Sequence, residues 1–252
     1  MKKRLQSITS TINTVSAIVI LLIAWQLVCS LRLIPSFMLP SPVQVLKAFI
    51  EDFPLLMYHT RVTLTEAFIG LFWGVVVGFL TAVLMDRFEI LYNAIYPLIV
   101  LTQTVPTVAV APLLVLWFGY EMLPKIILIV IATFFPITMG VLEGFRSVDK
   151  DEVDLLRAMG ASRFQIFRYI KVPGARGNFF AGLRISTSYS VVGAVISEWL
   201  GGFAGLGVYM TRVKKAFSYD KMFAVIFLIS VISLLLMKLV DLLQKKTMPW
   251  TR

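Results

Sequence analysis

The sequence predicts an all-α integral membrane protein with about six membrane-spanning helices. Of its 252 residues, 58% are hydrophobic and 15% are charged, whereas soluble domains carry about 25% charged residues. The mean hydropathy is +0.85, and several apolar runs reach the ~20 residues that a helix needs to cross the hydrocarbon core. The net charge of +10 agrees with the lysine and arginine excess that membrane proteins carry on their cytoplasmic side. We therefore expect a lipid bilayer around the chain and no nucleic-acid partner.

The cysteine and histidine content excludes several kinds of chemistry. The chain has one cysteine, Cys29, and one histidine, His59. A single cysteine cannot form an internal disulfide framework or a cysteine-based metal site, and a single histidine supplies no histidine cluster. We therefore expect no zinc, iron or haem chemistry. The three residues before Cys29, Gln-Leu-Val, lack the small residue that a lipoprotein cleavage site requires.

Six apolar segments are long enough to be spans. The first follows the basic residues 1–4; it is longer than the apolar region of a signal peptide and no A-x-A site follows it, so we interpret it as a retained helix. The third is too long for one straight span and contains Pro97, Pro106 and Pro112, so we expect it to be kinked or broken. The six expected spans are residues 12–31, 62–85, 90–118, 124–145, 179–200 and 222–243.

The distribution of basic residues predicts that both termini face the cytoplasm. With the N-terminus inside, the inner segments carry more lysines and arginines than the outer ones. The connection between spans five and six weakens this bias without reversing it, because four of its basic residues lie outside. These are Arg212, Lys214, Lys215 and Lys221.

The first outer connection contains a predicted surface helix. Ser41 followed by Pro42 is typical of a helix start, with the serine as N-cap and the proline in the first turn. Val43, Leu46 and Ile50 then fall on one face, so we expect this helix to lie at the membrane interface.

The inner connection over residues 147–174 is the most charged part of the chain outside the termini, and it predicts a helix–glycine–helix unit. Asp149 and Glu152 resemble a capping box, which places a first helix up to about Met159. Gly160 then ends the helix in the left-handed conformation. The apolar stripe of this helix is Leu155, Leu156 and Met159.

The second helix of this unit is expected to begin at the N-cap Ser162 and to end at Pro173. Its apolar contacts would come from Phe164, Phe167, Tyr169 and Ile170. Two interpretations remain open on physical grounds. The unit either rests on the membrane surface with its basic residues near lipid phosphates, or it docks into a groove of a cytoplasmic partner.

The spacing of this segment resembles the EAA loop of permease subunits of ATP-binding cassette importers. That pattern is Glu-Ala-Ala, three residues, Gly, nine residues, Ile, any residue, Leu-Pro. Here the chain has Asp154-Leu155-Leu156, Gly160, Ile170 and Val172-Pro173 at the same spacing. Asp replaces Glu, Val replaces Leu, and two leucines replace the two alanines.

The resemblance covers most of the chain and points to one branch of the family. The stretches LPSPVQVL, TVPTVAVAPLLVLWFG and EWLGGFAGLGVYM are similar to permeases of the nitrate/sulfonate/taurine branch. That branch includes presumed transporters of thiamine-precursor pyrimidines, and the last stretch favours that group.

The resemblance implies a single transmembrane permease domain over residues 1–252, with the type I importer fold, in a bacterial cytoplasmic membrane. It implies a path shared with a second permease, most simply a second copy, a cytoplasmic ATPase dimer that binds ATP and magnesium, and an extracytoplasmic solute-binding protein. The chain itself would bind no cofactor and have no catalytic residues. The residues implied in coupling to the ATPase are Asp154, Leu155, Leu156, Ala158, Gly160, Ala161, Ile170 and Pro173.

Polar residues inside spans are candidates for the translocation path, because such groups are costly against lipid. Gln103 and Thr104 lie near mid-depth beside Pro106, although Gln103 is also suited to a helix–helix hydrogen bond. Tyr189 is suited to stacking on a ring, or to a structural role. The small residues around it fit helix packing better than substrate contact; they are Ser186, Ser190 and Gly193.

Four charged residues lie near span ends and are expected to snorkel to the interface; they are Glu66, Glu143, Arg184 and Glu198. Glu198 is also a path candidate, because the glycine-rich residues 201–207 that follow it indicate a tight bend or an outer gate. No fixed positive charge lies near mid-membrane, which argues against a strongly anionic substrate. We expect a small organic solute such as a thiamine-precursor pyrimidine, with sulfonate, taurine or nitrate as the alternative.

Two other classes are disfavoured by what the sequence lacks, and a third is left to experiment. An ion-coupled secondary transporter would have inverted repeats and buried acidic residues for coupling, and neither is evident in the sequence. A membrane-embedded enzyme would have clustered Asp, His or Cys at one depth, and no such cluster is evident either. ATP-dependent flux would exclude the third class, a scaffold without transport activity.

Overall fold

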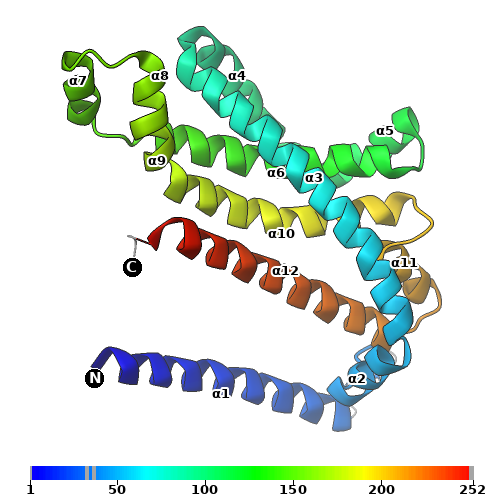
Figure 1. Cartoon of the computed structure of the whole chain (residues 1–252). Helices are drawn as coiled ribbons and strands as arrows, with labels where there is room; N and C mark the ends of the chain where they lie inside the picture. Colours follow the sequence, from blue (N-terminus) through cyan, green and yellow to red (C-terminus); the bar gives the residue numbers. More distant parts are fainter. Residues whose placement is uncertain (1, 32–33, 36–37, 250–252) are drawn as a thin grey trace. The chain divides into compact units, whose positions relative to one another are not determined.

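The computed structural model describes residues 2–31, 34–35 and 38–249, and within them the secondary structure is helical. The elements run in the order shown in Figure 1. They are α1 (Lys2–Ser30), α2 (Pro42–Glu51), α3 (Phe53–Arg87), α4 (Glu89–Thr102), α5 (Thr107–Phe118), α6 (Met122–Arg146), α7 (Lys150–Ala158), α8 (Arg163–Ile166), η1 (Phe167–Lys171), α9 (Val172–Gly174), α10 (Arg176–Leu200), α11 (Leu206–Lys215) and α12 (Tyr219–Thr247).

The chain divides into two compact units. The first comprises Met1–Met57 with Tyr209–Leu228, and the second comprises Tyr58–Val208 with Ile229–Arg252. The single permease domain expected over residues 1–252 therefore stays a prediction. The second unit contains the candidate sites.

Within the described residues, four helices are long and apolar enough to cross a membrane: α3, α6, α10 and α12. They contain the expected spans two, four, five and six. The described apolar part of α1, Val15–Ser30, is shorter than a full span. The all-α membrane fold is confirmed, whereas the number of six spans stays a prediction.

The expected break in the third span is confirmed. Helices α4 and α5 together satisfy the length and hydropathy of one span, but their axes bend by 99°. The break falls between Thr102 and Thr107, and Pro106 is the N-cap of α5. Proline has no N–H and disfavours the helical conformation of the preceding residue. Pro97 and Pro112 remain inside α4 and α5, so one proline of the three marks the break.

The second unit is built on a close contact between α6 and α10. A Cβ on Gly140 would lie 2.6 Å from the carbonyl oxygen of Asn178, and a Cβ on Gly182 would lie even closer to the carbonyl oxygen of Pro136. The Ser186 hydroxyl donates a hydrogen bond of 2.7 Å to the carbonyl of Thr133. Small residues therefore let the two backbones touch, which supports the packing role expected for Ser186.

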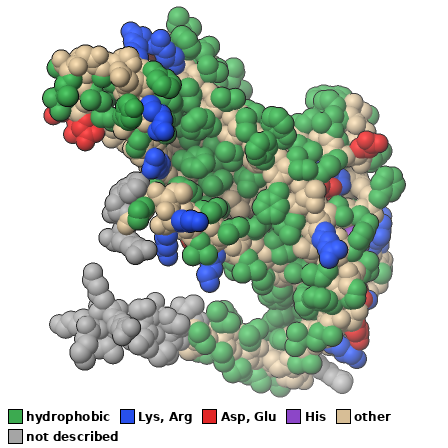
Figure 2. All heavy atoms as spheres, in the orientation of Figure 1, with side chains coloured by type: hydrophobic (Ala, Val, Ile, Leu, Met, Phe, Trp, Pro, Cys, Tyr) green, Lys and Arg blue, Asp and Glu red, His purple; other side chains and the backbone are tan. Residues whose placement is uncertain are grey.

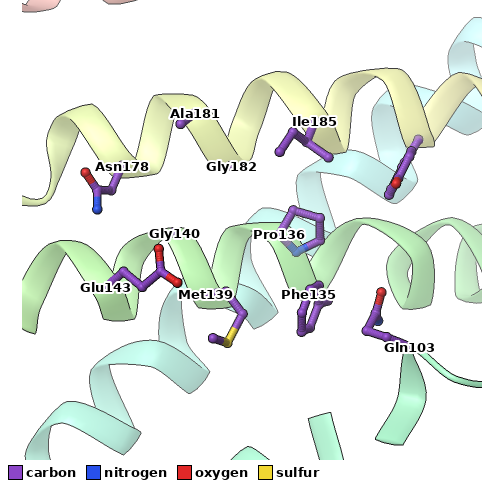
Figure 3. Close-up of a pocket in the computed structure, with 11 residues that line it drawn as sticks. Gln103, Phe135, Pro136, Met139, Gly140, Glu143, Asn178, Ala181, Gly182 and Ile185 are labelled. Atoms are coloured by element: carbon purple, nitrogen blue, oxygen red, sulfur yellow. The ribbon is translucent and has the colours of Figure 1, made fainter. Parts of the chain in front are cut away.

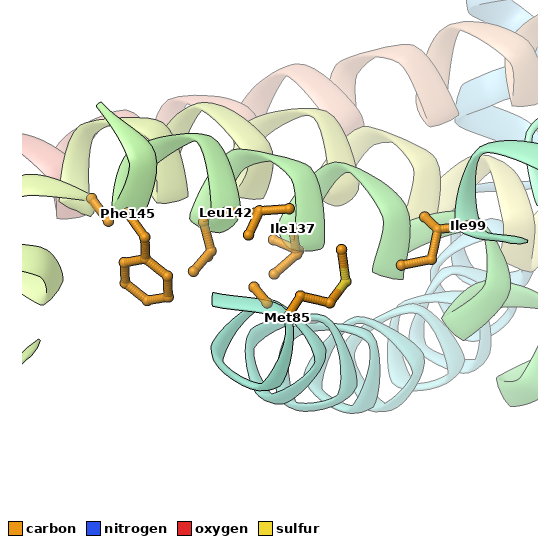
Figure 4. Packing of buried hydrophobic residues seen from close by; sticks show 8 residues of the cluster. Met85, Ile99, Ile137, Leu142 and Phe145 are labelled. Atoms are coloured by element: carbon orange, nitrogen blue, oxygen red, sulfur yellow. The ribbon is translucent and has the colours of Figure 1, made fainter. Parts of the chain in front are cut away.

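The hydrophobic core of this unit lies between α3 and α6. Figure 4 shows the side chains of Met85, Ile137, Leu142 and Phe145 meeting there, with Ile99 of α4 at one end. Each of these side chains is at most 3% exposed. This core fixes the C-terminal end of α3 against the C-terminal half of α6, from which the α7–α8 segment emerges.

In the first unit, α2 begins as expected from its sequence. Ser41 and Gln44 form a capping box, and Pro42 occupies the first turn. Val43, Leu46 and Ile50 are exposed, while Val45 and Ala48 are buried. The helix is amphipathic, and its place at the membrane interface stays a prediction.

Asp52, directly after α2, ties together distant parts of the first unit. Its carboxylate accepts hydrogen bonds from the Lys221 ammonium at 2.8 and 2.9 Å and from the Tyr209 hydroxyl. Burial acts to raise the pKa of Asp52, but the two hydrogen bonds and the ammonium charge outweigh it, so the pKa lies below its ordinary value. Burial, followed by the bond to Asp52, raises the pKa of Tyr209. The ionised carboxylate therefore stabilises this part of the fold.

Candidate functional site

The α7–α8 hairpin, residues 149–166, begins with the predicted N-cap. The Asp149 carboxylate accepts a hydrogen bond of 2.9 Å from the amide of Asp151. The expected capping box with Glu152 is not formed, because this bond goes to the second residue of the helix and a capping box requires the third. The acidic first turn, Asp151 and Glu152, still suits the positive end of the helix dipole.

The turn at Gly160 is a complete Schellman motif. The amide of Gly160 donates to the carbonyl of Arg157, and the amide of Ala161 donates to the carbonyl of Leu156, both at 2.9 Å. The φ angle of Gly160 is +84°, and nothing lies within 4 Å of where a Cβ would be. The prediction that Gly160 ends α7 is confirmed, and the reason is backbone conformation rather than close approach to a neighbour within the chain.

The second helix starts as predicted but does not end as predicted. Ser162 and Gln165 form a capping box at the start of α8. The expectation that Pro173 ends this helix is wrong, because α8 continues through the π-helical turn η1 and α9 almost directly into α10. The amide of Val172 bonds to the carbonyl of Phe167, five residues back. This wider turn relieves the clash that a proline ring makes with the carbonyl four residues earlier.

The residues expected to contact an ATPase divide into two groups by exposure. Asp154, Leu155, Ala158 and Gly160 are exposed, whereas Leu156, Ala161, Ile170 and Pro173 are half-buried. The exposed apolar surface of the segment also includes residues that the motif does not specify. The exposed large side chains are Leu155 (63%), Met159 (73%), Phe164 (73%) and Tyr169 (70%).

Figure 2 shows acidic and basic side chains gathered around hydrophobic ones over the α7–α8 end, while the surfaces of the long helices are mostly hydrophobic. In the hairpin, Asp154 pairs with Arg157 at 2.9 Å on an exposed face. Exposed pairs of this kind contribute little to stability. An apolar patch rimmed by charge on a protruding hairpin is typical of a protein interaction surface.

The base of the hairpin is fastened to the long helices by polar and aromatic contacts. Lys171 donates to both carboxylate oxygens of Asp86, at the end of α3, at 2.7 and 2.8 Å. The Phe167 ring packs edge-on against Phe145 of α6, with centroids 5.3 Å apart. These contacts connect η1 to the ends of both α3 and α6.

Two cavities lie beside the break between α4 and α5. The first, of about 510 Å³, lies along α6 and α10 and is shown in Figure 3. The second, of about 280 Å³, continues beyond Tyr189. Gln103 and Tyr189 line both cavities, and Pro106 lines the second.

The other two path candidates are placed elsewhere. Thr104 donates to the carbonyl of Leu101 at 2.8 Å and lines neither cavity. Glu198 is 2% exposed and accepts hydrogen bonds from the Thr63 hydroxyl at 2.7 Å and the Gly207 amide at 2.6 Å. Gln103 donates to the neighbouring Thr102 hydroxyl and not to another helix.

The polar cluster around Glu198 fastens the glycine-rich turn to α3. The amide of Gly205 donates to Nδ1 of His59 at 2.9 Å, and the amide of Leu206 donates to the Thr63 hydroxyl at 2.8 Å. Nearby on α3, Glu66 pairs with Lys125 of α6 at 2.6 Å. From the sequence, His59, Thr63 and Lys125 were not identified as site residues. The spacing of His59, Thr63 and Glu66 was a usable signal, because it places all three on one face of a helix.

Three of the four charges expected to snorkel have partners within the protein instead: Glu66 and Arg184 form ion pairs, and Glu198 accepts hydrogen bonds. Glu66 and Glu198 are at most 4% exposed, and Arg184 bonds to Asp241 and Gln244 of α12. A charge held inside the protein by a partner costs less than one left alone. Glu143 differs, because it is exposed and lines the first cavity.

The fold and these sites define a helical membrane permease, and comparison with known proteins gives its family. Residues 74–249 match the family described as "Binding-protein-dependent transport system inner membrane component". The chain belongs to this family and is a multi-pass protein of the cytoplasmic membrane. This confirms the predicted resemblance to permease subunits of ATP-binding cassette importers, in the nitrate/sulfonate/taurine branch.

Individual relatives cover nearly the whole chain. The Formylaminopyrimidine transport permease protein ThiX of Halalkalibacterium halodurans is 35% identical over 254 residues, covering 100% of this chain and 99% of that protein. The Taurine transport system permease protein TauC of Escherichia coli is 31% identical, covering 97% and 90%. The Riboflavin transport system permease protein RibX of Chloroflexus aurantiacus is 30% identical, covering 92% and 88%.

The solved structures support the fold. A chain of the MetNI methionine ABC transporter in inward-facing conformations superposes with a TM-score of 0.69 at 19% identity, covering 78% of this chain and 97% of that one. A chain of an amino acid ABC transporter superposes with a TM-score of 0.67 at 18% identity, covering 79% and 96%. These likenesses confirm the importer permease fold.

Proposed function

We propose that this permease carries a thiamine-precursor pyrimidine, or a closely similar small organic solute, through an ATP-driven importer. The proposal is supported by the full-length similarity to a formylaminopyrimidine permease and by the absence of lysine and arginine from the described residues that line the two cavities. Import of sulfonate or taurine by the same machinery is the alternative, favoured by the 31% identity to a taurine permease.

In this proposal the chain works with three kinds of partner. A cytoplasmic ATPase dimer binds ATP and magnesium, and an extracytoplasmic solute-binding protein delivers the substrate. A second permease completes the path, because the cavities of a single chain are not enclosed; a homodimer is the simplest assembly. Both termini and the α7–α8 hairpin lie in the cytoplasm. The chain itself binds no cofactor.

The observation that carries the proposed ATP-driven mechanism is the protruding α7–α8 hairpin. Its tip is exposed, and its base is held against the long helices. Leu155 and Met159 are exposed apolar residues on α7, suited to a groove on a partner. When the ATPases close on ATP, they push on this surface. The coupling residues are Asp154, Leu155, Leu156, Ala158, Gly160, Ala161, Ile170 and Pro173.

The movement then passes through η1 into the membrane. The Lys171–Asp86 pair carries it to α3, and the Phe167–Phe145 contact carries it to α6. The continuous helical course from η1 to α10 carries it to the third long helix of the unit. Because packed helices move as rigid bodies, a push at the hairpin tilts these helices and opens the path on the other side.

The path itself follows the cavities beside the α4–α5 break. Gln103, Pro106 and Tyr189 line it, and Tyr189 supplies a ring on which a heterocycle can stack. Thr104 lies in the same break. Glu198 acts next to the path, by holding the 201–207 turn that closes its outer end.

Reconstitution tests the proposal. The permease is placed in proteoliposomes with its ATPase and binding protein, and solutes are screened by stimulated ATP hydrolysis and by uptake. We expect stimulation by aminopyrimidines and none by taurine or nitrate. Stimulation by taurine alone would establish the alternative substrate class and leave the assignment as a permease intact.

A further inference from the structure

The 510 Å³ cavity is lined by two polar side chains that form no hydrogen bond or ion pair with a described residue. Glu143 of α6 and Asn178 of α10 line it (Figure 3), and neither bonds to another of the described residues. Glu143 is also the sole charged residue among the described residues that line the cavity. A carboxylate and an amide at a membrane path, both without partners, are available to a ligand.

The nearby cations are already engaged elsewhere. The Arg146 guanidinium lies over the Tyr92 ring, 3.7 Å from its centroid, and Arg184 bonds to Asp241 and Gln244. The charge of Glu143 is therefore not neutralised by these arginines. An anionic solute in this cavity meets a like charge, and no lysine or arginine is among the described residues that line it.

The close packing of α6 and α10 places the side chains of Glu143 and Asn178 at the contact between the two helices. Gly140 touches the backbone of Asn178, and Glu143 lies three residues further along the same helix, on the same face. Figure 3 shows the side chains of Glu143 and Asn178 on facing helices, with Gly140 between them. Their separation is thus set by backbone contact and not by flexible loops.

The chemistry of the pair matches an amino group attached to a nitrogen ring. An asparagine amide can recognise adenine by bonding its amino group and a nearby ring nitrogen together, and a 4-aminopyrimidine likewise presents an amino donor beside a ring-nitrogen acceptor. A carboxylate accepts the remaining N–H of that amino group. Phe135 and Tyr189 add aromatic rings to the same lining.

We propose that Glu143 and Asn178 are specificity-determining residues that recognise the amino edge of an aminopyrimidine and reject anions during passage through the permease. This inference rests on the proposed function, since it takes the cavity to be part of the path. To the proposed function the inference adds which residues select the substrate and which edge of the substrate they contact.

The test uses the reconstituted importer with its binding protein and two ligands, a 4-amino-2-methylpyrimidine and the analogue without the amino group. Uptake is measured for wild type, Glu143→Gln, Glu143→Asp and Asn178→Leu. The matched control is Glu89→Gln, which removes an exposed glutamate of α4 outside the cavity. Direct binding of the radiolabelled aminopyrimidine to the permease–ATPase complex without binding protein is measured in parallel.

We expect the wild type and Glu89→Gln to favour the amino compound equally. Glu143→Gln and Asn178→Leu should each reduce this preference and the direct affinity about tenfold or more, as for a lost hydrogen bond to a charged or buried group. Glu143→Asp should recover part of the preference, which a purely structural role would not produce.

The outcomes separate the inference from the proposed function. If the wild type imports the aminopyrimidine and both cavity variants keep its preference and affinity, the inference is wrong and the proposed function stands. If the wild type imports only anions, the proposed substrate class fails, and the inference fails with it. Poor folding of one cavity variant leaves the other to decide, because they lie on different helices.

Discussion

Replacement of Gly160 gives the sharpest test of the α7–α8 hairpin as a coupling element. A valine there must adopt φ near +84°, which costs an L-residue about 1–2 kcal/mol and a β-branched one more. Nothing within 4 Å obstructs a side chain, so the whole effect is conformational. The easiest relief is loss of the Schellman motif, whose two hydrogen bonds contribute about 1 kcal/mol each.

A loss of 1–2 kcal/mol reduces the ratio of correctly shaped to distorted hairpins by a factor of about 5–30. Because the hairpin is exposed, the rest of the fold should be unaffected. We expect Gly160→Val to insert normally and to hydrolyse ATP, while the amount of solute imported per ATP falls several-fold.

Gly160→Asn is the matched control, because asparagine tolerates the left-handed conformation. It adds a side chain of similar size and should keep most of the coupling. The assay is the ratio of uptake to ATP hydrolysis in proteoliposomes. Equal ratios for the valine and asparagine variants would refute the conformational argument, and normal uptake by Gly160→Val would refute the docking role.

Three further predictions concern two half-buried ion pairs and the buried carboxylate of Glu198. Lys171→Met should break the pair with Asp86 and lower uptake per ATP, and adding Asp86→Leu should lower it little further, because the pair is already lost; additive losses in this double-mutant cycle would contradict force transmission through the pair. Glu198→Gln should loosen the 201–207 turn, which limited proteolysis would detect as faster cleavage there than in wild type. For Asp52, whose pKa is lowered in the folded state, the stabilisation is present above about pH 4 and is lost as the pH falls through the folded pKa. Asp52→Asn should therefore lower the melting temperature at pH 7 but match wild type at strongly acidic pH; a constant difference would contradict the ionic role.

The sequence predicts well those features that depend on neighbouring residues. Asp149, Gly160 and Ser162 were identified as caps because capping uses bonds between residues a few positions apart. The break at Pro106 is likewise a local backbone effect. Pro173 shows the limit of such rules, since a proline usually ends a helix but here a π-turn accommodates it.

Features that depend on distant residues were not predicted. Thr63 and Glu198 meet across 135 positions of sequence, and Lys125 finds Glu66 across 59. Composition and periodicity place each of these charges near the end of a span, but they do not say which partner a neighbouring helix supplies. The role proposed for Glu143 depends in the same way on the approach of α6 to α10 at Gly140 and Gly182.

Measuring the energy source of uptake tests most directly the central claim that this permease works in an ATP-driven importer. Proteoliposomes containing the permease, its ATPase and its binding protein are loaded with ATP, and aminopyrimidine uptake is measured with and without ionophores that collapse ion gradients. We expect uptake that requires ATP and the binding protein and is unchanged by the ionophores. Uptake that proceeds without the ATPase and disappears with the ionophores would contradict the account.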